Sequence, residues 1–121
     1  MRKGAWNIHE RIRDMDLGGL WASANFPSML TGFSGSIFSQ ASDQGLGFAT
    51  MKAWNDWMFD EWYSPYPERI IPIALTWLAD PVLGAAEVRR NAARGVRSLA
   101  FPELPHWLGY PSIHTKHWDP V

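Results

Sequence analysis

The stretch PERIIPIALTWLADPVLGAAEVRRNAARGVRSLAFP, residues 67–102, decides the fold of this chain. It contains an apolar run over 70–78, an Ala-rich amphipathic segment over 81–94 and a second apolar run over 96–101. This order predicts strand, helix and strand, and the two strands are expected to be parallel because parallel strands need a long crossover connection. Parallel sheets occur almost only in α/β folds, which bind ligands at the carboxyl ends of their strands. We therefore expect an α/β protein with any site at that edge.

The helix over 81–94 carries clear start and stop signals. Asp80 is a good N-cap, and Pro81 suits the first helical position because no N–H donor is needed there. Gly95 is predicted to end the helix. The inner face is expected to be formed by three apolar side chains, Ala85, Val88 and Ala92.

A basic cluster follows on the last turns of the same helix, formed by Arg89, Arg90 and Arg94. Cations at this position complement the negative end of the helix dipole, so the cluster is predicted to be a solvated face. Phosphate binding is the alternative interpretation, although phosphates prefer helix N-termini.

Further elements precede this unit. The segment LWASANF, residues 20–26, alternates larger apolar residues with small ones and is predicted to be a buried strand. Helices are predicted over 9–15 and over 43–63. The Gly/Ser-rich segment 28–43 is expected to be a loop, and loops of this length tend to be functional or mobile.

The long helix presents two apolar rows, and Ser42 or Asp43 is expected to cap it. The first row comprises Leu46, Ala49, Ala53 and Trp57, and the second comprises Trp54, Met58 and Trp62. A helix this apolar is expected to be covered on more than one side, by the sheet and by another helix or subunit. Mid-helix Asn55 and Asp56 are expected to form structural hydrogen bonds.

Length, composition and charge limit the classes of function that this chain can have. The chain has 121 residues, which suits a single domain over 1–121, and its net charge of −1 gives no electrostatic case for nucleic acid or an anionic membrane. No apolar run approaches the ~20 residues that span a bilayer, and no signal sequence follows Met1. The absence of cysteine fits a reducing compartment, so a cytoplasmic location is expected.

Eight tryptophans are the compositional oddity. The first interpretation is that the tryptophans pack in the core and at contact surfaces, where large aromatic side chains dominate. An aromatic pocket for a planar substrate is the second. Stacking on single-stranded nucleic acid is the third, but the interleaved basic residues that it requires are missing.

Four short motifs carry a family resemblance when they are taken in order: RIRDMD, WNDW, PERIIP and DPVLGAAEVRR, followed by PSIHTKHWDPV. With this order and spacing the chain resembles the amidohydrolase-related metal-dependent hydrolases. More narrowly, it resembles the branch that includes aminocarboxymuconate semialdehyde decarboxylase and the aromatic-acid decarboxylases. The resemblance covers essentially all of the chain. It implies part of a (β/α)₈ TIM barrel, about strands two to four with their helices, without strand one and strands five to eight.

The resemblance also implies chemistry that depends on a divalent metal, Zn or Mn, in the complete enzyme. The family's metal ligands lie in an H-x-H or E-x-H motif on the first strand, at the ends of the fifth and sixth strands, and on the eighth. Those segments have no counterpart here, so no catalytic or metal residue is carried over and no bound metal is expected for this chain alone. An intrinsic site built from His114, His117, Asp119 and His106 is an alternative, but the Pro-rich setting offers no regular element to orient such ligands.

Candidate substrate-pocket residues lie where the predicted strands end, because a barrel's active face is at the carboxyl ends of its strands. These candidates are Asn25, Phe26, Trp77, Phe101 and Glu103, with His114 and His117 in the loop that follows the last strand. Each also has a plainer interpretation. Glu103 could be an exposed acidic residue in a loop, and Asn25 could form a turn. The aromatic residues could serve in ordinary core packing.

Two functions are compatible with these observations. The first is a fragment of a metal-dependent hydrolase or non-oxidative decarboxylase for a small organic or aromatic substrate, inactive as an isolated chain. The second is a non-catalytic α/β protein that binds or oligomerises through its tryptophan-rich helix face. The segment Trp118–Val121 repeats the Asp-Pro helix start, which favours the first because a helix is then expected to follow.

Overall fold

The computed structural model describes residues 1–27 and 30–121, which form four α-helices and four short strands. The helices are α1 (Ile8–Leu17), α2 (Ser36–Ser39), α3 (Gln44–Trp57) and α4 (Pro81–Ala93). The strands are β1 (Ser23–Ala24), β2 (Ile70–Ile71), β3 (Ile73–Leu75) and β4 (Ser98–Ala100). Single 3₁₀ turns form at Lys3–Ala5, Phe33–Gly35, Pro105–Leu108 and Lys116–Trp118, and a π-helical turn over Met58–Tyr63 continues α3.

All strand pairings among these residues are parallel, as the sequence predicts. β1 pairs with β2, where Ser23 lies opposite Ile70, and β3 pairs with β4, where Leu75 lies opposite Ala100. Pro72 alone separates β2 from β3, since a proline has no N–H for the ladder. One extended segment therefore pairs with β1 along its first part and with β4 along its second. Each strand is shorter than its predicted apolar run, because the neighbouring strand pairs with only part of that run.

The helix boundaries follow the predicted signals closely. The Asp80 side chain accepts hydrogen bonds from the backbone N–H groups of Val82 and Leu83, at 2.8 and 3.1 Å, and Asp43 caps α3 in the same way. Gly95, just past α4, has φ +103°, which favours glycine. A further cap that the prediction lacked is Asn7, whose side chain accepts from the Glu10 N–H at the start of α1.

Of the two apolar rows predicted for the long helix, the second is at least partly buried and the first is exposed. The buried residues of α3 are Gly47, Met51 and Asn55, followed in the π-helical turn by Met58 of the second row. The row that begins at Leu46 points outward instead, and Leu46 and Trp57 are 64% and 42% exposed. The reason is that the buried row includes a polar residue, Asn55, and a glycine, so apolar periodicity alone selects the neighbouring row.

Two smaller expectations also need correction. In α4, Ala92 is exposed, whereas Glu87 and Asn91 are buried beside Ala85. The segment expected as a loop over 28–43 contains a 3₁₀ turn and α2, and Gly35 lies against the Leu75 side chain. The first two residues of that segment lie outside the described residues.

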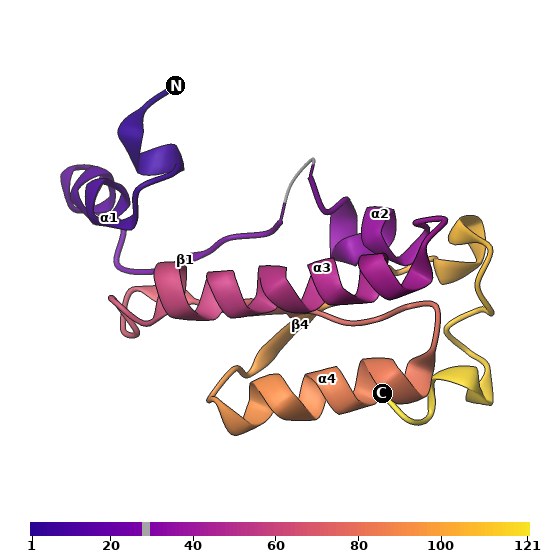
Figure 1. Ribbon diagram of the computed structural model, residues 1–121. Coiled ribbons are helices and arrows are strands. Elements are labelled where there is room, and N and C mark those ends of the chain that lie inside the picture. Colours follow the sequence, from indigo (N-terminus) through magenta and orange to yellow (C-terminus); the bar gives the residue numbers. More distant parts are fainter. Residues whose placement is uncertain (28–29) are drawn as a thin grey trace.

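The helices α3 and α4 run side by side in the same direction, with β4 behind them in this view, and α1 stands apart at the end near β1 (Figure 1). The larger hydrophobic core joins β3 to α2 and α3, with Phe38, Met51, Leu75 and Trp77 among its members. A smaller core packs α1 against Ile70. Among the described residues no helix combines the length and apolar character needed to cross a bilayer.

Candidate functional site

The carboxyl end of β4 opens into an apolar groove of ≈ 510 Å³, which we call the β4 groove. It is lined by Phe33, Phe101, Pro102, Glu103, Leu104, Trp107 and Leu108. The predicted candidates Phe101 and Glu103 thus lie together, at the strand end where the prediction placed them. Phe33 could not be anticipated, because this side chain reaches the groove from a turn that is distant along the chain.

The chemistry of the β4 groove is that of a binding surface. Its walls are aromatic and aliphatic, and Glu103 supplies the only ionisable side chain among the described lining residues. The volume falls within the ~300–1,000 Å³ range of small-molecule pockets. No nucleophile beside a base is found among those lining residues, so the groove can hold an apolar molecule but offers no catalytic pair of its own.

Asn25 and Phe26 line a different space, a cavity of ≈ 320 Å³ between α1 and α3. We call it the α1–α3 cavity, and its lining comprises Gly4, Ala5, Arg11, Asn25, Phe26, Pro27, Trp54, Trp57, Met58 and Trp62. Phe26 stacks on Phe33 of the β4 groove, with ring centroids 6.0 Å apart. This aromatic pair joins the two sets of lining residues.

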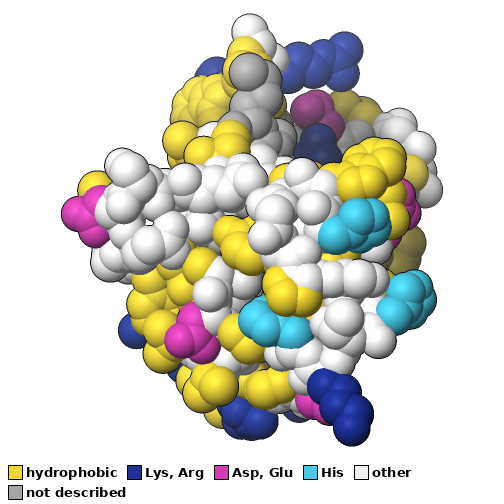
Figure 2. Space-filling model, turned by 90° about the vertical axis from the view of Figure 1, so that its right-hand side faces the viewer, with side chains coloured by type: hydrophobic (Ala, Val, Ile, Leu, Met, Phe, Trp, Pro, Cys, Tyr) yellow, Lys and Arg dark blue, Asp and Glu magenta, His cyan; other side chains and the backbone are white. Residues whose placement is uncertain are grey.

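The remaining candidates lie outside both spaces. Trp77 is only 3% exposed and packs on Phe48 in the larger core, with ring centroids 5.4 Å apart. His114 is exposed, and His117 packs edge-on against Trp118. Histidine side chains are spread apart over the face shown in Figure 2. Across residues 1–27 and 30–121 no group of three or more His, Asp or Glu is placed to hold a metal ion.

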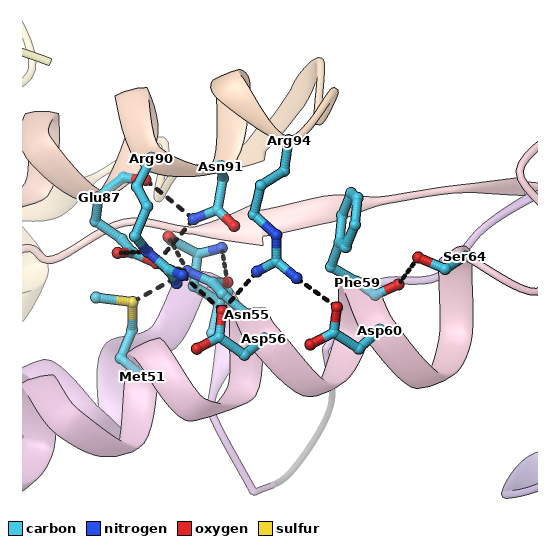
Figure 3. Close-up of polar contacts among 11 residues, drawn as sticks. Met51, Asn55, Asp56, Phe59, Asp60, Ser64, Glu87, Arg90, Asn91 and Arg94 are labelled. Atoms are coloured by element: carbon cyan, nitrogen blue, oxygen red, sulfur yellow. Dashed lines mark hydrogen bonds and ion pairs between the residues drawn. The ribbon is translucent and has the colours of Figure 1, made fainter.

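A buried polar cluster between α3, α4 and β3 is the main feature that the sequence did not reveal (Figure 3). The Asn55 amide pairs with the backbone of Leu75, donating to its carbonyl at 3.0 Å and accepting from its N–H at 2.8 Å. At Leu75 the Asn55 side chain takes the place of a neighbouring strand, because among the described residues β1 pairs only with β2, earlier along the same segment. Its Nδ2 also donates to Glu87, at 2.9 Å.

Glu87 is the centre of this cluster and is almost fully buried. Arg90 donates to both of its carboxylate oxygens, at 2.7 Å each, and Asn91 donates to one of them at 2.8 Å. Burial alone would raise the pKa of Glu87. The hydrogen bonds from Arg90, Asn55 and Asn91 outweigh that effect, so the pKa of the carboxyl lies below its ordinary value.

An ion-pair chain extends from the cluster to the surface and links the two helices. Asp56 of α3 accepts from Arg90 of α4 and from Arg94 at the C-cap of that helix, each at 2.6 Å, and Arg94 also reaches Asp60. Burial opposes ionisation of Asp56, but the two guanidinium groups lower its pKa. The Arg94 guanidinium lies 4.1 Å from the centre of the Phe59 ring.

These contacts correct the prediction for the basic cluster. Arg90 and Arg94 are ion-paired to α3, and only Arg89 lies on an exposed face. The expectation that Asn55 and Asp56 form structural hydrogen bonds is confirmed. A usable signal exists in the sequence, because Asp56 and Asp60 are spaced i, i+4 like Arg90 and Arg94, so two helices side by side can match them.

Comparisons with known proteins add no family to this geometry. No family model matches the sequence, and no curated protein matches it.

Proposed function

We propose that this chain forms consecutive β/α units, about the second to fourth, of a (β/α)₈ barrel of the amidohydrolase-related type. The observation that carries the proposal is the arrangement of the parallel strand pairs in sequence order, with α3 on the connection from β1 to β2 and α4 on the connection from β3 to β4. The crossover helices α3 and α4 contact each other through Asp56 and Arg90. Successive crossover helices in contact suit a singly wound barrel wall better than a doubly wound sheet, in which helices occupy both faces.

In this proposal the chain supplies part of the wall of an active site and not its metal. The β4 groove lies at the carboxyl end of a strand, where barrel enzymes bind substrates. Its aromatic lining suits a small organic substrate. The described residues offer no ligand set that fits the divalent metal implied by the resemblance, so no catalytic step is assigned to this chain.

The decisive experiment reads the coding DNA on both sides of this frame. The proposal expects an H-x-H or E-x-H motif encoded upstream, and a helix followed by a strand-end histidine encoded downstream. Metal analysis of the purified chain is the second test, with far less than one zinc or manganese per chain expected. One tightly bound ion per chain would contradict the assignment of the metal ligands to other segments.

A non-catalytic binding or oligomerising protein is the second candidate, and one observation favours it. Large aromatic side chains are exposed on several elements, among them Trp6, Trp21, Phe26, Trp57 and Trp107. Contiguous apolar patches mark contact surfaces, and Trp57 has Trp62 as a neighbour, with ring centroids 5.9 Å apart. If regulatory signals bracket the frame closely and the purified chain is a cooperatively unfolding dimer without metal, this candidate replaces the first.

A further inference from the structure

Three residues that line the α1–α3 cavity each carry a buried nitrogen donor without an acceptor among the described residues. The nitrogens are Arg11 Nε from α1, Asn25 Nδ2 from the segment after β1, and Trp54 Nε1 from α3. Each nitrogen is buried, and within the described chain none of the three has a hydrogen-bond partner. Solvent does not reach them either, and buried donors are almost always paired, so three together require an explanation.

The orientation of the Asn25 amide follows from its neighbours. Its Oδ1 accepts from Arg11 Nη2 at 3.0 Å and from Ser23 Oγ at 2.8 Å. Two donors on one side of the amide identify that side as the oxygen. The NH₂ group must then face away from Arg11 Nη2 and remains available as a donor.

The cavity is also lined by a guanidinium group, that of Arg11, without an ion-pair partner among the described residues. None of the ion pairs formed by the described residues involves Arg11. The Asp14 side chain lies against Gly4, which lines the cavity, yet it does not pair with Arg11. A guanidinium, an amide NH₂ and an indole N–H are all donors, so the group that complements them is an anion that only accepts hydrogen bonds.

The rest of the lining is apolar and largely flat. Trp54 and Trp57 lie with ring centroids 5.0 Å apart, and Trp57 and Trp62 lie 5.9 Å apart. Met58 and Phe26 complete this wall. The volume of ≈ 320 Å³ is at the lower end of the ~300–1,000 Å³ range for ligand pockets, which suits a small molecule.

We propose that the α1–α3 cavity binds a small carboxylate with an apolar body, whose oxygens accept from Arg11, Asn25 and Trp54 and whose body packs on the tryptophans. A carboxylate has two oxygens that can accept several hydrogen bonds, and a guanidinium matches its geometry. All three nitrogens are closed to solvent in the free chain, so the side chains of Arg11, Asn25 and Trp54 turn toward the ligand when it binds. The cavity is separate from the β4 groove, and the proposal holds whether or not the chain is part of a barrel.

The test uses phenylacetate as the probe, with phenylacetamide as its neutral counterpart of the same shape. Titration calorimetry of the full chain is expected to show one site for phenylacetate and binding at least tenfold weaker for the amide. In a two-dimensional ¹H–¹⁵N spectrum, the Trp54 indole N–H signal, identified by its absence in Trp54→Phe, is expected to move downfield with added phenylacetate. Equal binding of the two probes, or no binding of phenylacetate, would overturn the proposal.

Variants of α1 separate this site from general electrostatic attraction. Arg11→Gln is expected to weaken phenylacetate binding by about 10- to 140-fold, which corresponds to a charge-assisted hydrogen bond of ~1.5–3 kcal/mol. Arg13→Gln makes the same charge change on the same helix, at a side chain that is exposed and paired with Glu10, and should leave binding unchanged. Arg11→Lys keeps the charge and serves as the second variant if the glutamine variant does not fold. Equal losses in the Arg11 and Arg13 glutamine variants would refute a specific site.

Discussion

Replacing Asn55 by leucine is the most direct way to test how β3 is held against α3. Leucine has a similar size and favours helix, but it cannot pair with the Leu75 N–H and carbonyl that the amide now satisfies at 2.8 and 3.0 Å. Both backbone groups lie where water does not enter, and leaving such a group unpaired costs ~1–3 kcal/mol. We therefore expect Asn55→Leu to lower the free energy of unfolding by about 2–6 kcal/mol, a large share of the ~5–15 kcal/mol typical of a domain.

Urea unfolding followed by far-UV circular dichroism measures this loss. With an m-value near ~2 kcal/mol/M, a mid-range loss of ~4 kcal/mol lowers the urea midpoint by about 2 M. Asn91→Leu is the matched control, because Asn91 is equally buried but its Oδ1 has no partner among the described residues and its Nδ2 serves only Glu87. Arg90 still satisfies Glu87 in that variant. If Asn55→Leu costs no more than Asn91→Leu, the pairing with the strand does not stabilise the fold.

Three further outcomes are expected. The folded-state pKa of Glu87 is lowered, so on acidification the Glu87 carboxylate is protonated first in the unfolded chain. The free energy of unfolding of the wild type should therefore fall as pH drops below 4.5. Glu87→Gln should flatten this dependence of the free energy of unfolding on pH, measured by urea titrations at several pH values. Arg94→Met, at a partly exposed chain of ion pairs, should cost only about 1 kcal/mol in thermal melts, and a loss above ~3 kcal/mol would contradict a surface role. Gly84→Ala should destabilise the fold by ~1–3 kcal/mol, since the new Cβ would lie 2.6 Å from the Trp77 carbonyl oxygen. The control Gly45→Ala should be neutral or stabilising, because its Cβ would meet only Asp43, at 3.4 Å. Equal melting temperatures for the two variants would refute this packing.

The elements of the fold were predictable because their signals are local. Asp80, Pro81 and Gly95 fix the bounds of α4 through hydrogen bonds and backbone angles that involve only adjacent residues. The parallel pairing was predictable as well, because a helix between two apolar runs leaves few other connections. Strand lengths were overestimated, since an apolar run shows what can be buried but not how far its neighbour follows it.

The side-chain arrangement was less predictable, for a physical reason. Periodicity identifies an inner face by its apolar residues, whereas α3 and α4 bury Asn55, Glu87 and Asn91 against each other and against the strand. These groups are stable there only because they satisfy one another, a condition that depends on two helices and a strand at once. The β4 groove was predictable only in part, from Phe101 and Glu103 at a strand end, because Phe33 and Trp107 join it through the tertiary fold.

The location of polar and apolar surface bears on both functional proposals. The surfaces that α3 and α4 share are polar and ion-paired, so their spacing is set by directional contacts between Asp56, Arg90 and Arg94. The outward row of α3, by contrast, is apolar, with Leu46 and Trp57 exposed. A barrel wall needs such faces where a further β/α unit packs, and a dimer needs one where a second copy packs. The two proposals therefore predict burial of the same row, and the oligomeric state of the purified chain distinguishes them: a monomer leaves Leu46 and Trp57 for another part of a barrel, and a dimer that Trp57→Glu dissociates assigns them to a second copy.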